Sequence, residues 1–161
     1  AVALLGWAGG FLTPVLLATP EPNAVGLFVY VVVLSAGLLV ILARKEAWVA
    51  LEPLTLVGTH VIFLSWRLSF YTSDQFWIAA PFLVVHWLLF YAYDVMRVLQ
   101  TSMGHVMVRH ANAAANALLF YVALFFVIDP AHPAWTGSVT VTIAGAYGLT
   151  AFTLSRRDVT T

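Results

Sequence analysis

Long apolar runs, separated by short polar or proline-containing turns, dominate the chain. A helix needs about 17–25 mostly apolar residues to cross about 30 Å of hydrocarbon, because each residue adds about 1.5 Å. Six runs approach this length, at about 1–18, 25–43, 49–68, 75–97, 112–128 and 136–154. The pattern therefore predicts an all-α fold, a polytopic bundle of about six transmembrane helices in a single module.

The first run differs from the others in its glycine and proline content. Gly6, Gly9 and Gly10 lie within it, and Pro14 lies near its end. A proline inside a helix removes a backbone donor and disturbs the preceding turn. We therefore expect the first span to be broken near Pro14. The chain also begins at Ala1 within an apolar run, so we interpret it as part of a longer chain or complex.

Positive side chains gather on one side of the six predicted spans. That side receives Arg44, Lys45, Arg97, Arg109, Arg156 and Arg157, and the other side receives Arg67. Lys and Arg accumulate in the short cytoplasmic loops of membrane proteins. The charge bias thus predicts that residues 44–48, 98–111 and 155–161 are cytoplasmic.

Composition supports lipid as the main partner of the chain. Of its 161 residues, 62% are hydrophobic and 9% are charged, and seven basic side chains balance seven acidic ones. A soluble domain of this size cannot bury so much apolar surface. The lack of a basic excess removes the electrostatic basis for nucleic-acid binding. The absence of cysteine excludes disulfides, thiolate nucleophiles, Cys-type zinc sites and iron–sulfur clusters.

Small and amide side chains mark faces on which the helices are expected to pack. Helices in lipid associate through close backbone approach and a few polar contacts. The residues with suitable spacing are Gly6 and Gly10 in the first run, Asn112 and Asn116 in the fifth, and Thr140, Ala144 and Gly148 in the sixth. These faces either hold this bundle together or dock to other membrane subunits or to missing spans of the same protein.

Two histidines lie inside predicted spans, where polar groups are costly and suggest function. His60 and His86 differ in depth by only about 4–5 Å, so neighbouring antiparallel spans can bring them together. A buried imidazole can hydrogen-bond between helices, bind a metal or tetrapyrrole, or relay a proton. Asp94 lies about 12 Å along the helix from His86, so proton transfer between them requires water. Its spacing from Arg97 also allows an ion pair within the helix.

Catalytic motifs are missing from the sequence. It contains no HExxH pair, no glycine-rich phosphate loop and no GxSxG elbow. We therefore predict no catalytic residues, no metal site and no bound cofactor. The alternative is a tetrapyrrole held by His60 or His86.

One block of sequence resembles a known family. Gly9-Gly10-Phe11-Leu12-Thr13-Pro14 is followed by Leu27-Phe28-Val29-Tyr30, Arg44-Lys45-Glu46-Ala47-Trp48 and Gly58-Thr59. This arrangement resembles a family of large predicted bacterial multi-pass membrane proteins catalogued as a domain of unknown function. The resemblance covers residues 1–70 best, and it implies many spans and a bacterial inner membrane but no catalytic residue. His60 stands where the family pattern leads us to expect an aromatic residue.

Three functions are compatible with these features. The first is a non-catalytic membrane module or accessory subunit that scaffolds or anchors a larger assembly. The second is a transport module for a solute, lipid or envelope precursor. The third is a pigment- or haem-binding subunit of an electron-transfer complex, with His60 or His86 as the axial ligand.

Overall fold

Six α-helices make up the part of the chain that the structure describes. The computed structural model describes residues 2–16, 23–45, 48–99 and 106–158. The helices are α1 (Val2–Leu16), α2 (Ala24–Arg44), α3 (Leu51–Phe70), α4 (Phe76–Leu99), α5 (Val106–Ala131) and α6 (Thr136–Asp158). Two 3₁₀ turns, η2 (Ser73–Gln75) and η3 (Pro133–Trp135), lead into α4 and α6. These ranges contain no strand, which confirms the predicted all-α class.

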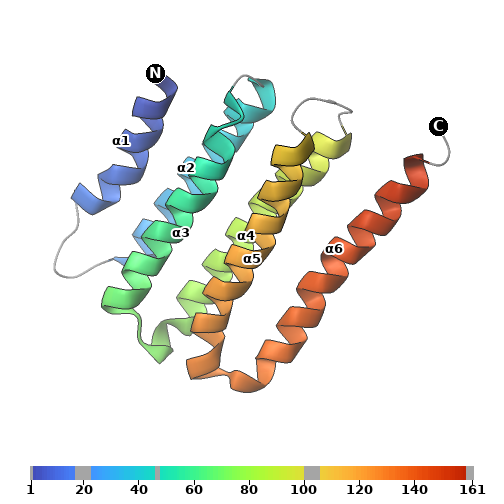
Figure 1. Ribbon diagram of the computed structural model, residues 1–161. Coiled ribbons are helices and arrows are strands. Elements are labelled where there is room, and N and C mark those ends of the chain that lie inside the picture. Colours follow the sequence, from blue (N-terminus) through green and yellow to red (C-terminus); the bar gives the residue numbers. More distant parts are fainter. Residues whose placement is uncertain (1, 17–22, 46–47, 100–105, 159–161) are drawn as a thin grey trace.

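The helices run alternately up and down, with α1 at one edge of the bundle and α6 at the other (Figure 1). The end of α2, the end of α4 and the C-terminal end of α6 lie at the same end of the bundle (Figure 1). Three segments of the described chain are long and apolar enough to cross a membrane, namely Ala24–Arg44, Ser73–Leu99 and His110–Ala131. Membrane crossing by the remaining helices, and the cytoplasmic placement of the positively charged end, stay predictions.

Most helix bounds lie within two residues of the predicted spans, but α5 is longer at both ends and α6 continues from the predicted end at 154 to Asp158. It was expected over 112–128 and runs from Val106 to Ala131. Residues 106–111, assigned to a cytoplasmic connection, thus form its first turns. Parts of three predicted segments lie outside the described ranges. They are residues 17–18 of the first predicted span, residues 100–105 of that connection and residues 159–161 of the C-terminal segment.

The helix α1 continues through Pro14 to Leu16. Proline lacks an N–H group, so Pro14 leaves the carbonyl of Gly10, four residues earlier, without its usual donor. The Tyr30 hydroxyl of α2 donates to this oxygen at 2.8 Å. A contact between helices thus replaces the missing bond within the helix and ties α1 to α2.

The end of α5 uses the same arrangement. Pro130 lies inside the helix and leaves the carbonyl of Phe126 without its usual donor. Arg67 of α3 donates to that oxygen from Nη2 at 3.0 Å, and its guanidinium carbon lies 5.3 Å from the centre of the Phe126 ring. Arg67, the exception to the charge bias, therefore joins α3 to α5.

A glycine allows α1 to approach α3 closely. A Cβ atom at Gly58 would lie 3.0 Å from the Phe11 ring and 3.2 Å from the Trp7 ring. Such distances leave no room for a side chain, so the backbone of α3 is in contact with the aromatic face of α1. Gly10 has a similar contact with Leu34 of α2, at 3.0 Å.

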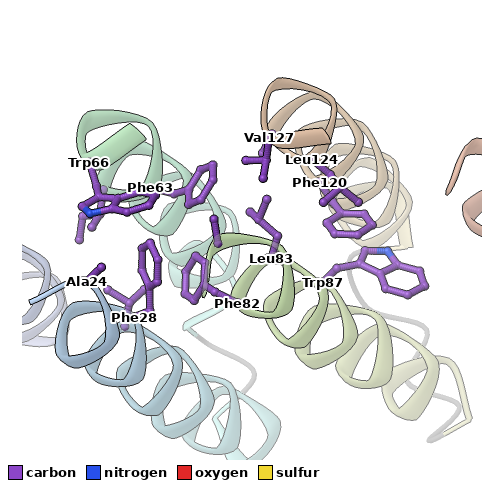
Figure 2. Packing of buried hydrophobic residues seen from close by; sticks show 14 of the residues in the cluster. Ala24, Phe28, Phe63, Trp66, Phe82, Leu83, Trp87, Phe120, Leu124 and Val127 are labelled. Atoms are coloured by element: carbon purple, nitrogen blue, oxygen red, sulfur yellow. The ribbon is translucent and has the colours of Figure 1, made fainter. Parts of the chain in front are cut away.

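The core consists of a large cluster rich in aromatic side chains and a smaller cluster of leucines with two aromatic side chains. In the aromatic cluster the Phe28 and Phe82 rings stack at 4.2 Å, and the Phe28 and Trp66 rings meet edge to face at 4.7 Å. Figure 2 shows these side chains meeting between α2, α3 and α4, with Trp87 and Phe120 on the α5 side. The second cluster lies toward the end of α2 and contains Leu39, Leu42, Leu51, Leu56, Phe90 and Tyr93.

Candidate functional site

The two histidines of the predicted spans meet at the α3–α4 interface. The ring centres of His60 and His86 are 6.1 Å apart, with the ring planes 77° from parallel. Both side chains are buried, at 6% and 2% exposure respectively. The expectation that consecutive antiparallel helices bring these residues together is confirmed by this distance. We call them the histidine pair.

The hydrogen bond made by His60 determines which of its nitrogens carries the proton. Its Nδ1 lies 2.9 Å from the carbonyl oxygen of Leu56, which can only accept, so Nδ1 donates. In the neutral ring this leaves a lone pair on Nε2. The Ser35 and Thr59 hydroxyls, which lie 3.2 Å apart, add a polar contact between α2 and α3 at the neighbouring position. His60 is therefore oriented by its own helix.

His86 lies among aromatic rings. Phe82 and Phe90, one turn before and after it on α4, have ring centres 5.7 Å and 5.1 Å from the imidazole. Neither ring nitrogen has a hydrogen-bond partner within the part of the chain that the structure describes. A buried polar group without a partner costs about 1–3 kcal/mol. The pair therefore has the capacity to bind a further hydrogen-bonding species.

A second polar pair lies at the same interface, nearer the end of the bundle that carries Arg44. Glu52, in the first turn of α3, is 3% exposed. A side-chain hydrogen bond joins it to Asp94 of α4, which is partly buried. We call these residues the carboxyl pair. The sequence suggested Asp94 as a partner of Arg97, and it did not indicate this contact.

The amide side chains of α5 lie on its buried face. Asn116 is fully buried, and its Nδ2 donates to the Trp87 carbonyl at 3.3 Å and approaches the Tyr147 hydroxyl at 3.5 Å. The Trp87 indole donates to the same hydroxyl at 3.2 Å. Asn112, one turn earlier, is also buried, at 6% exposure. Asn116 thus joins α4, α5 and α6, as expected of a residue at a helix contact.

Only some of the small residues predicted to form helix contacts in α1 and α6 meet another helix of the bundle. Gly10 contacts α2, whereas a Cβ atom at Gly6 would meet nothing within 4 Å. In α6, the Thr140 hydroxyl donates to the Tyr121 hydroxyl of α5 at 3.4 Å. Ala144 and Gly148 are exposed. A Cβ atom at Gly148 would also meet nothing within 4 Å, so the C-terminal part of this stripe faces away from the rest of the described helices.

The chemistry open to these sites is limited. Within the described ranges, no group of three or more His, Asp or Glu side chains could hold a metal ion. The histidine pair offers two imidazoles close to packed phenyl rings. Cofactor binding by His60 or His86, including a tetrapyrrole, stays a prediction.

Sequence reasoning missed three features of the bundle. They are the close approach at Gly58, the donation from Arg67 to the carbonyl freed by Pro130, and the carboxyl pair. The position of a proline does signal a freed carbonyl four residues earlier. The neighbour that supplies its donor depends on how the helices are arranged.

Comparison with known proteins identifies the family of the chain. No curated protein and no solved structure matches it. The family model described as "Predicted membrane protein (DUF2339)" matches residues 1–161, the whole chain, including the part after residue 70 where the resemblance was weakest. The chain therefore belongs to this family of predicted membrane proteins, whose function is unknown.

Proposed function

We propose that this chain is a non-catalytic, multi-pass membrane module that docks to further transmembrane helices through α6 and so scaffolds a larger membrane assembly. The observation that carries the proposal is the composition of the outward face of α6. That face presents the small residues Ser138, Gly145 and Gly148 beside the larger Val141, Leu149 and Phe152, all of them exposed. A Cβ atom at Gly145 or Gly148 would meet nothing within 4 Å.

The outward face of α2 shows what a lipid-facing surface looks like in the same bundle. Val25, Val29, Val33 and Val40 are each more than half exposed, at 54%, 58%, 65% and 56%. Large aliphatic side chains suit contact with acyl chains. Small residues such as those of α6 instead allow two helix backbones to approach closely. The α2 face has one exposed glycine, Gly37, among four valines, whereas the α6 face has two glycines and a serine. On this difference in small residues we assign lipid to the α2 face and a protein partner to the α6 face.

The position of α6 supports this reading. It lies at the edge of the bundle and packs on α5 (Figure 1). Hydrogen bonds from Trp87 to Tyr147 and from Tyr91 to the Ala146 carbonyl hold its inner face to α4. The inner face is thus anchored by polar contacts, and the outer face is left for another helix.

Cysteine crosslinking tests the proposal, because the chain has no cysteine and one introduced thiol is unique. With Gly148→Cys, a short thiol-directed photocrosslinker in native membranes should join α6 to neighbouring membrane helices. Val29→Cys, on the valine face of α2, is the control and should give lipid adducts. Gly145→Leu should reduce crosslinking from Gly148→Cys, because its side chain separates the two backbones.

The mass of the crosslinked product distinguishes the sources of the partner. A second membrane subunit gives an intermolecular product, another part of the same polypeptide gives an internal one, and two copies of the chain give a doubled mass. Equal protein crosslinking from Gly148→Cys and Val29→Cys, or lipid adducts alone from both, would refute docking through α6.

A further inference from the structure

The histidine pair leaves nitrogen atoms without partners inside the bundle. Both nitrogens of His86 are buried and have no hydrogen-bond partner in the part of the chain that the structure describes. His60 donates from Nδ1 to the Leu56 carbonyl, which leaves a lone pair on its Nε2. Buried polar atoms without partners are rare in native proteins, because each one costs free energy. The pair is therefore a candidate for completion by a ligand.

The hydrogen bond of His60 is of the kind that metal-binding histidines make. An imidazole that binds a metal through one nitrogen usually donates its other N–H to a backbone carbonyl or a carboxylate, which fixes the tautomer and the orientation of the ring. In His60 the Leu56 carbonyl, 2.9 Å from Nδ1, has this role. The two nitrogens of an imidazole point in nearly opposite directions, so Nε2 points away from this carbonyl. His60 thus has one nitrogen anchored and the other prepared to bind.

The ring of His86 can present a nitrogen to the same ligand. Half a turn about the Cβ–Cγ bond exchanges nitrogen and carbon positions without changing the shape of the ring. No hydrogen bond within the described ranges holds His86 in one of these two orientations. In either tautomer of the neutral ring, one nitrogen has a lone pair. His86 can therefore turn a lone pair toward His60 without altering the packing around it.

The distance between the two rings fits one metal ion between them. A metal–nitrogen bond to histidine is about 2.0 Å long and the nitrogen lies about 1.1 Å from the ring centre, so two imidazoles on opposite sides of an ion have centres about 6.2 Å apart. The centres of His60 and His86 are 6.1 Å apart. The angle of 77° between the ring planes is compatible with this arrangement, because each ring is free to rotate about its bond to a two-coordinate ion.

The number of ligands selects the ion. The described chain offers no third His, Asp or Glu side chain to a metal at this position. Zinc takes four ligands, and calcium and magnesium take six or more oxygens. Copper binds imidazole well, and its monovalent ion forms stable complexes with two ligands in a line. A monovalent ion also costs less to bury than a divalent one. Two imidazoles without an acidic ligand thus suit copper(I).

The surroundings of the pair are dry and aromatic. Phe82 and Phe90 have ring centres 5.7 Å and 5.1 Å from the His86 ring, and Phe63, which stacks on Phe82, has no measurable exposure. Copper(I) is readily oxidised or disproportionates in water, and exclusion of water protects it. Aromatic rings also attract cations through their faces. The packing around the pair therefore favours the reduced ion.

We propose that the histidine pair is a two-coordinate binding site for copper(I), which joins α3 to α4. One bond forms from the Nε2 lone pair of His60 and the other from a lone pair of His86. Both imidazoles are neutral and keep their N–H protons, so binding releases no proton and needs no change in oxidation state. The ion is small enough to lie between the two rings while Phe82 and Phe90 stay packed.

Anaerobic competition with the copper(I) chelator bicinchoninic acid tests the proposal, using the full chain in lipid nanodiscs. The wild type should remove one copper(I) per chain from the coloured chelate. His60→Phe and His86→Phe should each weaken binding by at least about 100-fold, the upper end of the cost of losing an outer partner of a metal ligand. The matched control replaces the other three of the five histidines, His105, His110 and His132, by Phe and should bind as the wild type does. A wild type that takes no copper(I) overturns the proposal, whether or not the variants fold.

X-ray absorption spectroscopy of the loaded wild type identifies the ligands. The copper edge should have the shape typical of two-coordinate copper(I), with two nitrogen neighbours and the scattering of imidazole rings. Sulfur neighbours would place the ion on Met96, Met103 or Met107 and overturn the assignment to the histidine pair. Zinc(II) should not bind to the pair, so retention of one zinc per chain that is lost in His86→Phe would overturn the assignment to copper(I).

Discussion

The link between Pro14 and Tyr30 leads to a prediction that one pair of substitutions can decide. Tyr30→Phe removes only the hydroxyl that donates to the Gly10 carbonyl. In the wild type no other donor is supplied by the helix, because residue 14 is proline. In a Pro14→Ala background, the N–H of residue 14 can bond the same carbonyl, so the hydroxyl becomes redundant.

The size of the effect follows from one neutral hydrogen bond. Such bonds contribute about 0.5–1.5 kcal/mol, and those between membrane helices average about 0.6 kcal/mol. We therefore expect Tyr30→Phe to lower the free energy of unfolding by about 0.6–1 kcal/mol in the wild type. In the Pro14→Ala background the same change should cost less than about 0.3 kcal/mol, because the carbonyl keeps a donor.

Reversible unfolding by SDS in mixed micelles measures these differences. Trp7 of α1 lies against Gly58 of α3, where a Cβ atom would be 3.2 Å from its ring, so its share of the fluorescence of the six tryptophans should report the docking of α1. Tyr121→Phe is the matched control, since Tyr121 contacts α6 and is remote from this proline. Tyr121→Phe should lower the free energy of unfolding by the same amount whether residue 14 is proline or alanine.

Equal costs of Tyr30→Phe in the two backgrounds would contradict the reasoning. That result would mean that the hydroxyl stabilises α1 through packing or another contact, and not by satisfying the carbonyl that proline leaves free.

Three further predictions concern other contacts of the bundle. Gly58→Val should destabilise the protein by about 1–3 kcal/mol, since it displaces the rings of α1, whereas Gly6→Val, with nothing within 4 Å, should change unfolding by less than about 0.5 kcal/mol. Arg67→Met should cost about 1.5–3 kcal/mol, because the carbonyl near the end of α5 loses a charged donor, and most of this loss should be recovered when the proline of α5 is replaced by alanine. Replacing His60 and His86 together by Phe should leave the protein inserted and folded, as measured by circular dichroism and protease protection. Loss of a bound chromophore from that variant would instead favour the haem-binding alternative.

The fold class could be predicted because the signal is local. Apolar runs of membrane-spanning length, separated by Pro, Gly and charge, indicate helices whatever their neighbours are, since the backbone must satisfy its own hydrogen bonds in lipid. The bounds of α2 and α4 therefore agree with the sequence within two residues. The start of α5 was placed too late, because the polar residues before Asn112 resemble a loop and are nonetheless helical.

The histidine pair could be predicted in part from depth. Two polar residues at similar depth on consecutive antiparallel helices are candidates for contact. Depth does not fix rotation about the helix axis, and rotation decides whether two side chains at one level face each other. The carboxyl pair shows this limit, since Glu52 and Asp94 also match in depth and the sequence suggested only an ion pair with Arg97 for Asp94.

By itself, the amino-acid sequence determined the all-α class, indicated a membrane protein and predicted that its helices pack through small and polar residues. Only the tertiary structure decided which helices exchange those contacts: Tyr30 and Arg67 supply the donors that Pro14 and Pro130 remove, and α3 and α4 align two polar pairs. The physical reason is that hydropathy acts along one helix, whereas a hydrogen bond or a ring contact depends on the rotation and tilt of two helices.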